Sequence, residues 1–185
     1  RKLLHIMVIA VPVSTFFISK NLVIVFLGIL FLTAVIVEFA RKYVPRFRRI
    51  FLSVTGPLLR SNEFDTITGA TLLLFSSLAS LTLFQLWIAR TVLFMVIISD
   101  SLGAVIGKWK GKREIFNGKT VAGSIVFLTT GILIVLLVTG SKWPAGLFGL
   151  TAAFAAELFI TRVDDNLTIP LCGGIAMELF SYLIY

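Results

Sequence analysis

The chain has 185 residues, of which 58% are hydrophobic and only 14% are charged, and its formal net charge is +8. A soluble domain carries about 25% charged residues, so this composition excludes a soluble globular protein and indicates an integral membrane protein. The length suits one domain over residues 1–185, and the single cysteine, Cys172, excludes an internal disulfide. The cations lie in short loops between apolar segments, which predicts topology signals and lipid contacts and argues against nucleic-acid binding.

The apolar segments are each close to the length of about 20 residues that a helix needs to cross a bilayer. The sequence therefore predicts an all-α polytopic membrane protein with about seven transmembrane helices. The predicted helices cover residues 3–19, 21–40, 67–84, 86–106, 121–140, 144–161 and 168–185.

One long connection, residues 41–62, interleaves arginines with apolar residues at helical spacing. This pattern predicts a basic amphipathic segment that lies in the membrane interface and is broken at Gly56-Pro57. Just before it, Glu38 and Arg41 have the spacing of a structural ion pair on one helix face.

The cations are distributed unequally between the two ends of the predicted helices. When the helices alternate across the membrane, fourteen of the 17 Lys and Arg residues fall in connections on one side and two on the other. The positive-inside rule places that first side, with the N-terminus, in the cytoplasm and the C-terminus outside. Nearly all the acidic residues lie toward the same side, which attraction to lipid alone does not explain. A cytoplasmic active site that combines phosphates, metal and cations explains both.

The stretch from Asp100 to Gly123 carries the strongest chemical signal. Asp100 lies inside an apolar segment, where a carboxylate costs roughly 2.5–3.5 kcal/mol, so we expect it to serve a partner or a reaction. Gly103 and Gly107 share its helix face and would admit either a neighbouring helix or a ligand. A loop with five cations follows, which together with the acid suggests a metal-bound polyphosphate at a membrane surface.

The sequence Asn-Gly-Lys-Thr at 117–120 is not a nucleotide-binding phosphate loop, because Arg113 stands where that loop requires a glycine. Lys119 and Thr120 nevertheless open the next predicted helix. Backbone N–H groups and a cation converge there, as in a natural phosphate site.

Asp164, Asp165 and Asn166 form a second oxygen-rich cluster, directly before the last predicted helix. Magnesium prefers oxygen ligands, so Asp100 and Asp165 could share such an ion. Equally, Asn166 could cap the last helix while the aspartates complement its positive end. The sequence leaves both alternatives open.

These motifs, in this order, resemble the CTP-dependent lipid kinases. That family includes dolichol and polyprenol kinases, phytol and farnesol kinases and the fungal CTP-dependent diacylglycerol kinases, and it is distantly related to phosphatidate cytidylyltransferase. The resemblance covers nearly the whole chain, which lacks the additional helices or soluble extension of fungal and animal members. The matching residues are RKLLH at 1–5, Arg60 to Glu63 with Thr68-Gly69, Asp100 with Gly103 and Gly107, GKTVAGS at 118–124, Glu157, and DDNLTIP at 164–170.

The resemblance implies transfer of the γ-phosphate of CTP to the hydroxyl of a membrane-embedded isoprenoid alcohol or diacylglycerol, with magnesium as cofactor. The implied catalytic residues are Asp100, Lys119 and Asp165, and the implied metal ligands are Asp100, Glu157, Asp164, Asp165 and Asn166. The implied substrate-binding residues are Arg1, Lys2, Arg60, Glu63, Gly103, Gly107, Lys108, Lys112, Thr120 and Asn166. The alternatives are a phosphatidate cytidylyltransferase-like CDP-lipid synthase, which would release pyrophosphate, and a small membrane transporter. The identity of the acceptor and the formation of a homodimer stay open.

Overall fold

The structure, a computed structural model, describes residues 8–59, 61–116 and 118–184. It is 83% helical, which confirms the all-α class. The α-helices are α2 (Ala10–Ser14), α3 (Lys20–Tyr43), α4 (Pro45–Thr55), α5 (Gly69–Leu83), α6 (Leu86–Phe94), α7 (Asp100–Lys110), α8 (Val121–Val138), α9 (Trp143–Phe159) and α10 (Asp165–Ile184). Short helical turns are η1 (Gly56–Leu58), η2 (Ser61–Phe64), η3 (Met95–Ser99) and η4 (Gly140–Lys142).

Within the described ranges, four helices are long and apolar enough to cross a membrane: α3, the continuous helix Leu86–Lys110, α8 and α10. Helices α5 and α9 have 15 and 17 residues, which is shorter than the usual span of about 20. Of the first predicted segment, 3–19, the described part contains only the five-residue α2. The chain is thus a helical membrane protein, and the count of seven transmembrane helices is not confirmed.

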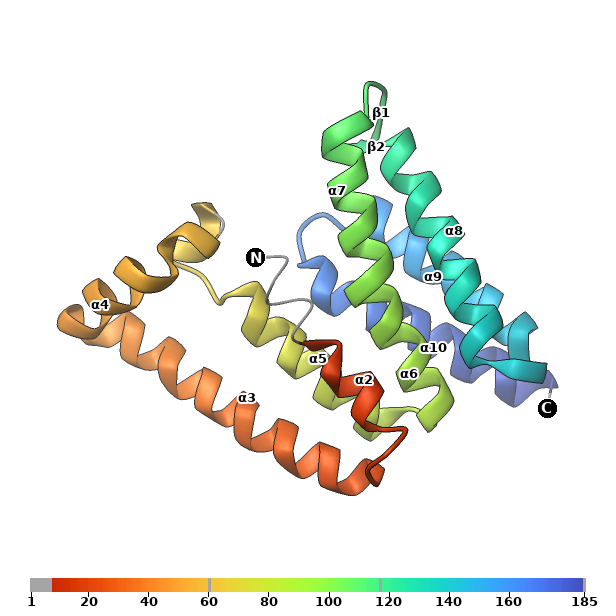
Figure 1. Cartoon of the computed structure of the whole chain (residues 1–185), viewed down its shortest axis with the longest axis horizontal. Coiled ribbons are helices and arrows are strands. Elements are labelled where there is room, and N and C mark those ends of the chain that lie inside the picture. Colours follow the sequence, from red (N-terminus) through yellow and green to blue (C-terminus); the bar gives the residue numbers. More distant parts are fainter. Residues whose placement is uncertain (1–7, 60, 117, 185) are drawn as a thin grey trace.

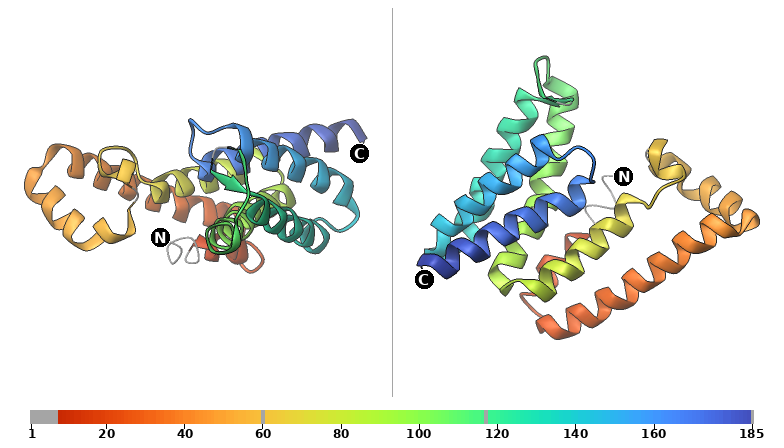
Figure 2. Two further views of the ribbon diagram at one scale, coloured as in Figure 1. Left: turned by 90° about the horizontal axis from the view of Figure 1, so that it is seen from above. Right: turned by 180° about the vertical axis from the view of Figure 1, so that it is seen from behind.

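The helices diverge from a shared base into two arms (Figure 1). Helices α3 and α4 form one arm, and α7 and α8 form the other, with α5 between the arms and with α9 and α10 behind α7 and α8. Helix α10 packs against α5, α6 and α9, while α3 packs mainly against α5. The views from above and from behind show the same separation of the two arms (Figure 2). Accordingly, 61% of the apolar window in Leu86–Lys110 is buried inside the protein, but only 11% of that in α3.

Glycines bring α7 and α8 into backbone contact. A Cβ added at Gly103 would lie 3.0 Å from the carbonyl oxygen of Gly123, and one added at Gly123 would lie 2.7 Å from that of Gly103. A Cβ at Gly107 would lie 2.8 Å from the hydroxyl oxygen of Thr120. This close approach is the helix-packing role of small residues in membranes. The contact between α7 and α8 therefore fixes the position at which the loop after α7 begins.

A π-helical turn, η3, interrupts the long helix immediately before Asp100. Four of its five residues are buried, and Asp100 itself is only 8% exposed. Such turns are rare, and they occur frequently at functional sites because they redirect the side chains that follow.

A small β-hairpin joins α7 to α8 and is the exception to the predicted all-α architecture. Strands β1 (Glu114–Phe116) and β2 (Lys119–Thr120) pair antiparallel. The connection passes through Gly118, whose φ of 77° is readily available to glycine. The Asn-Gly dipeptide at 117–118 is a strong sequence signal for such a turn.

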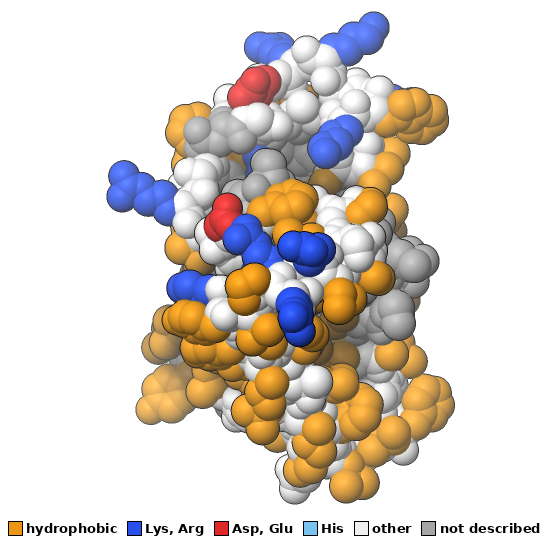
Figure 3. Space-filling model, turned by 90° about the vertical axis from the view of Figure 1, so that its left-hand side faces the viewer, with side chains coloured by type: hydrophobic (Ala, Val, Ile, Leu, Met, Phe, Trp, Pro, Cys, Tyr) orange, Lys and Arg blue, Asp and Glu red, His pale blue; other side chains and the backbone are white. Residues whose placement is uncertain are grey.

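Helix α4 lies within the predicted amphipathic segment and ends at Thr55, and η1 begins at Gly56, where the sequence predicted a break. Ile50 and Val54 are 64% and 71% exposed, and Arg46 and Arg49 are also exposed. Figure 3 shows the side of the molecule on which α4 lies. There, Lys and Arg side chains gather above a broad apolar region. This distribution is typical of a helix at a membrane interface.

Candidate functional site

One lysine from the hairpin meets two carboxylates from the adjoining helices α9 and α10. The ammonium of Lys119 in β2 donates hydrogen bonds to Glu157 Oε1 of α9 and to Asp165 Oδ2 of α10, both at 2.9 Å. Asp100 lies close enough to act electrostatically on both carboxylates. We call Asp100, Lys119, Glu157 and Asp165 the carboxylate–lysine cluster.

The cluster keeps Lys119 charged. Burial alone would lower the pKa of its ammonium, but the hydrogen-bonded carboxylates of Asp165 and Glu157 outweigh burial and raise the pKa above its usual value. Lys119 is therefore a permanent cation at neutral pH. An ammonium has three N–H donors, and Lys119 uses two of them within the cluster.

The hairpin positions Lys119 through the start of α8. Thr120 is the N-cap of that helix, and its hydroxyl accepts a hydrogen bond from the Gly123 N–H at 3.3 Å. Capping by threonine stabilises a helix start by about 1 kcal/mol. Lys119 therefore directly precedes the capped start of α8. The glycine contact between α7 and α8 holds this helix start in place.

A group of hydrogen bonds around Gly69, at the start of α5, forms a junction between three segments. Glu63 Oε1 accepts a hydrogen bond from the Gly69 N–H, and the Asn166 side-chain amide donates one to the Gly69 carbonyl, both at 3.1 Å. Glu63 and Asn166 are only 5% and 1% exposed. A Cβ at Gly69 would lie 3.0 Å from an atom of each, so a larger residue would separate them. The junction ties the segment before α5 to the start of α10.

The cap of α10 is Asp164, which corrects the expectation that Asn166 caps the last helix. Asp164 Oδ1 accepts a hydrogen bond from the Asn166 backbone N–H at 2.9 Å, and α10 begins at Asp165. The Asn166 side chain instead crosses to α5. Because Asp165 is the first residue of α10, its carboxylate lies at the positive end of the helix dipole.

A buried ion pair forms another wall of the site. Glu38 and Arg41 pair as predicted, and Arg41 is only 5% exposed. Arg41 also donates to the backbone carbonyls of Glu63 and Thr66, at 2.6 and 2.5 Å. Glu38 Oε1 accepts hydrogen bonds from Thr68 and Thr71. The pair thus fastens the C-terminal end of α3 to the start of α5.

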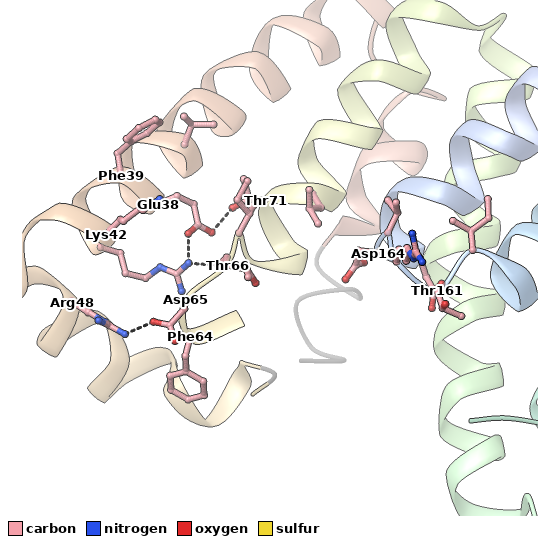
Figure 4. A pocket seen from close by; sticks show the side chains of 18 of the residues that line it. Glu38, Phe39, Lys42, Arg48, Phe64, Asp65, Thr66, Thr71, Thr161 and Asp164 are labelled. Carbon is pink, nitrogen blue, oxygen red and sulfur yellow. Dashed lines mark hydrogen bonds and ion pairs between the residues drawn. The ribbon is translucent and has the colours of Figure 1, made fainter. Parts of the chain in front are cut away.

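A pocket of about 1010 Å³ connects this wall with the cluster. Glu38, Lys42 and Arg48 lie on one side of it, and Thr161 and Asp164 lie across from them (Figure 4). Its polar and charged lining comprises Glu38, Arg41, Lys42, Arg48, Asp65, Thr66, Thr71, Lys119, Glu157, Thr161, Arg162, Asp164 and Asp165. Its apolar and aromatic lining comprises Val35, Phe39, Tyr43, Phe64, Ile67, Leu72, Ile160 and Val163.

Several of the predicted substrate-binding residues lie elsewhere. Lys108 and Lys112 are exposed around the end of α7 and do not line this pocket. Gly103 and Gly107 are occupied by the contact with α8. The predicted roles of Arg1, Lys2 and Arg60 fall outside the described residues.

Most of the lining residues, among them Glu38, Arg41 and Arg162, were not predicted site residues. For Glu38 and Arg41 the sequence showed only an ion-pair spacing, which does not indicate which surface the pair faces. Arg162 carried no signal beyond its charge.

The cluster fits a magnesium–nucleotide complex in its donor chemistry. Glu157 Oε2 is buried and has no hydrogen-bond partner, and the neighbouring donors are carboxylate oxygens. Among the described residues no group of three or more His, Cys, Asp or Glu side chains forms a ready-made cation site. Magnesium usually takes one or two carboxylates and completes its shell with water and substrate phosphates, so such a group is not required.

Comparison with known proteins identifies relatives along most of the chain. An uncharacterized protein of Rickettsia prowazekii is 24% identical over the whole chain and 95% of its own length. CTP-dependent diacylglycerol kinase 1 of Saccharomyces cerevisiae is 24% identical over 80% of the chain, and that of Eremothecium gossypii is 24% identical over the same share. This chain is a distant relative of the CTP-dependent lipid kinases.

The aligned region spans only 60% and 55% of those two fungal lipid kinases. No family model matches the chain. No solved structure matches it either.

Proposed function

We propose that this chain is a CTP-dependent lipid-alcohol kinase that transfers the γ-phosphate of CTP to the hydroxyl of a membrane-embedded alcohol, an isoprenoid alcohol or diacylglycerol. One observation carries the proposal most directly. Lys119, Glu157 and Asp165 of the carboxylate–lysine cluster line one end of a pocket whose remaining walls combine cations with apolar side chains. A donor with several phosphates and an acceptor with an apolar tail require these two environments side by side.

Binding of the triphosphate begins with cations. Lys119 has one N–H donor left for a phosphate oxygen, and Arg162 adds a second cation to the same wall. Phosphoryl transfer depends mainly on positioning and on neutralising charge, so fixed cations are the main contribution of the protein. Magnesium, held by Asp100 and Glu157 together with phosphate oxygens, would neutralise the charge that develops on the transferred group.

The acceptor hydroxyl attacks the γ-phosphorus and forms the new phosphorus–oxygen bond. The bond from the γ-phosphorus to the bridging oxygen of CDP breaks, and CDP leaves. We assign Asp165 as the group that orients the hydroxyl and takes its proton, because Asp165 lines the pocket whereas Asp100 does not. Lys119 of β2 holds Asp165 in place, and Glu157 of α9 binds the same ammonium.

The same proposal places the pocket, the hairpin and the segment before α10 on the cytoplasmic side. The strong bias of the cations toward that side supports this orientation. Nucleotide is present on that side, so the donor would reach the cluster directly, and the acceptor would arrive within the bilayer.

The experiment is incubation of purified protein with γ-labelled CTP, magnesium and a panel containing diacylglycerol, dolichol, farnesol and phytol. The kinase proposal requires label in one of these lipids and release of CDP. Parallel reactions with α-labelled CTP and phosphatidate test the synthase alternative, which would move that label into lipid and release pyrophosphate. Asp165→Asn should lose the activity. Asp65→Asn should keep it, because the Asp65 side chain is 80% exposed at the far end of the same pocket.

A further inference from the structure

The pocket has an apolar side that borders α3. Val35 and Phe39 of α3 and Leu72 of α5 line it, together with Ile67 just before α5. Val35 and Phe39 flank Glu38 in the sequence of α3, so apolar and polar lining meet within one helical turn.

This apolar side is continuous with the surface that faces lipid. Phe39 lines the pocket and is also 60% exposed, and its neighbours Leu32 and Ile36 on α3 are each 60% exposed. Helix α3 is one of the four helices long and apolar enough to cross a membrane. In a bilayer, acyl chains would therefore contact Phe39 from outside, and the same ring borders the pocket from within.

The opposite edge of the pocket is also partly apolar. Ile160 and Val163, in the turn between α9 and α10, line the pocket and are 36% and 44% exposed. The carboxylate–lysine cluster lies on this edge, because Glu157 precedes Ile160 by three residues and Asp165 follows Val163 by two. A molecule that spans the pocket would meet charges beside Lys119 and hydrocarbon beside α3.

We propose that Val35, Phe39, Ile67 and Leu72 form the subsite for the apolar tail of an uncharged lipid alcohol, which enters sideways from the bilayer past α3. This inference rests on the proposed function and adds where the acceptor lies. The pocket is charged at the cluster and apolar beside α3, and this difference sets the orientation of the bound alcohol. Its hydroxyl points to the cluster, and the first carbons of its tail lie against α3. The buried Glu38–Arg41 pair with Thr71 supports the wall between the two ends, so the subsite is preformed.

The test places a larger side chain in the proposed subsite and leaves the residues of the carboxylate–lysine cluster unchanged. Val35→Trp adds a large ring to the pocket wall, and Ile29→Trp adds the same ring to an exposed position of α3 that is not part of the lining. Val35→Trp should raise the KM for a long-chain acceptor at least tenfold and leave the KM for CTP within twofold of wild type. Ile29→Trp should change neither value. Equal effects of the two substitutions on the acceptor KM would overturn the subsite.

A second measurement does not depend on turnover. Diazirine-bearing diacylglycerol and diazirine-bearing farnesol are photolysed with the detergent-solubilised protein, and the labelled peptides are identified by mass spectrometry. We expect labelling at Val35 and Leu72 that excess unlabelled alcohol prevents, and labelling at Ile29 that it does not. If phosphatidylcholine prevents the labelling at Val35 and the alcohols do not, the site binds a structural lipid. That result would overturn the assignment. If no alcohol is phosphorylated, the kinase proposal fails, and this competition still decides whether the subsite binds alcohols.

Discussion

Replacing Lys119 by methionine should separate the structural and chemical roles of the carboxylate–lysine cluster. The substitution keeps a long apolar side chain but removes two charge-assisted hydrogen bonds of 2.9 Å. It leaves the carboxylates of Asp100, Glu157 and Asp165 without the cation that balances them. The matched control is Lys142→Met, which removes only the cation above the Trp87 ring at the other end of the bundle.

The expected loss of stability is intermediate. Each pair at 2.9 Å is worth roughly 6 kcal/mol at an effective dielectric constant of 20 before desolvation is subtracted. Breaking a fully buried pair costs about 3–5 kcal/mol, and Lys119 is 26% exposed, so we expect a net loss of about 2–3 kcal/mol. For a chain of this size that corresponds to a fall in Tm of roughly 4–12 °C in detergent. Lys142→Met should lower Tm by less than about 2 °C.

Two further measurements identify the cause. Lys119→Met combined with Glu157→Gln should recover much of the lost stability, because one of the uncompensated charges is removed, but kinase activity should stay low. Magnesium should raise the Tm of Lys119→Met more than that of wild type, since the carboxylates that have lost their balancing charge then accept a cation. A ligand at ten times its Kd stabilises by about 1.4 kcal/mol. If Lys119→Met keeps its full Tm and responds to magnesium as wild type does, the cluster does not hold these segments together.

The pH dependence of the same pair of proteins provides an independent check. Because the folded-state pKa of Lys119 is raised, its contribution to stability is complete below the usual pKa and is lost only as the pH rises through the higher folded value. The difference in Tm between wild type and Lys119→Met should therefore stay constant from about pH 7 to pH 9. A difference that closes within this range would contradict the raised pKa.

Three other predictions follow from the site and its support. Asp100→Asn should fold normally and lose kcat by about 10²–10³, as measured with labelled CTP, and full activity in this variant would remove Asp100 from the mechanism. Gly123→Ala should lower Tm markedly, because its Cβ would lie 2.7 Å from a backbone oxygen, whereas Gly28→Ala, which meets nothing within 4 Å, should be neutral or slightly stabilising. A cysteine at Asn117 in a Cys172→Ser background should react with an impermeant maleimide only after the membrane is permeabilised, and labelling in intact cells would reverse the orientation.

The sequence singled out the members of the cluster but not which of them touch. Asp100 stood out because a carboxylate is costly inside an apolar helix, and Lys119 stood out because it opens a helix. Glu157 entered only through the resemblance to lipid kinases. Which of these side chains touch depends on how β2, α9 and α10 pack, and no local spacing encodes that packing. The same limit explains Asn166, whose local pattern suggested a cap or a metal ligand, while its actual partner is a carbonyl 97 residues earlier.

The helices themselves were largely predictable from hydropathy, but their lengths were not. The apolar run at 144–161 extends beyond the helix that it contains, because α9 ends at Phe159 and the chain then turns. The run at 67–84 likewise includes the segment before Gly69, which is held by Glu38 and Glu63. The hairpin was missed although its Asn-Gly signal is present, because the basic loop around it favoured a purely electrostatic interpretation.

The π-helical turn before Asp100 has a consequence for the direction in which this side chain points. A π-turn accommodates one residue more than an α-turn, so the helix Leu86–Lys110 has two registers that are set independently. Its first part is oriented by the packing of α6 on α10, and its second part by the glycine contact with α8. If Met95–Ser99 formed a regular α-helical turn with the same number of residues, Asp100 would be rotated by about 100° about the helix axis. Hydrophobicity would be unchanged, and yet the carboxylate would turn away from its partners, so the direction of Asp100 depends on the π-turn and not on composition.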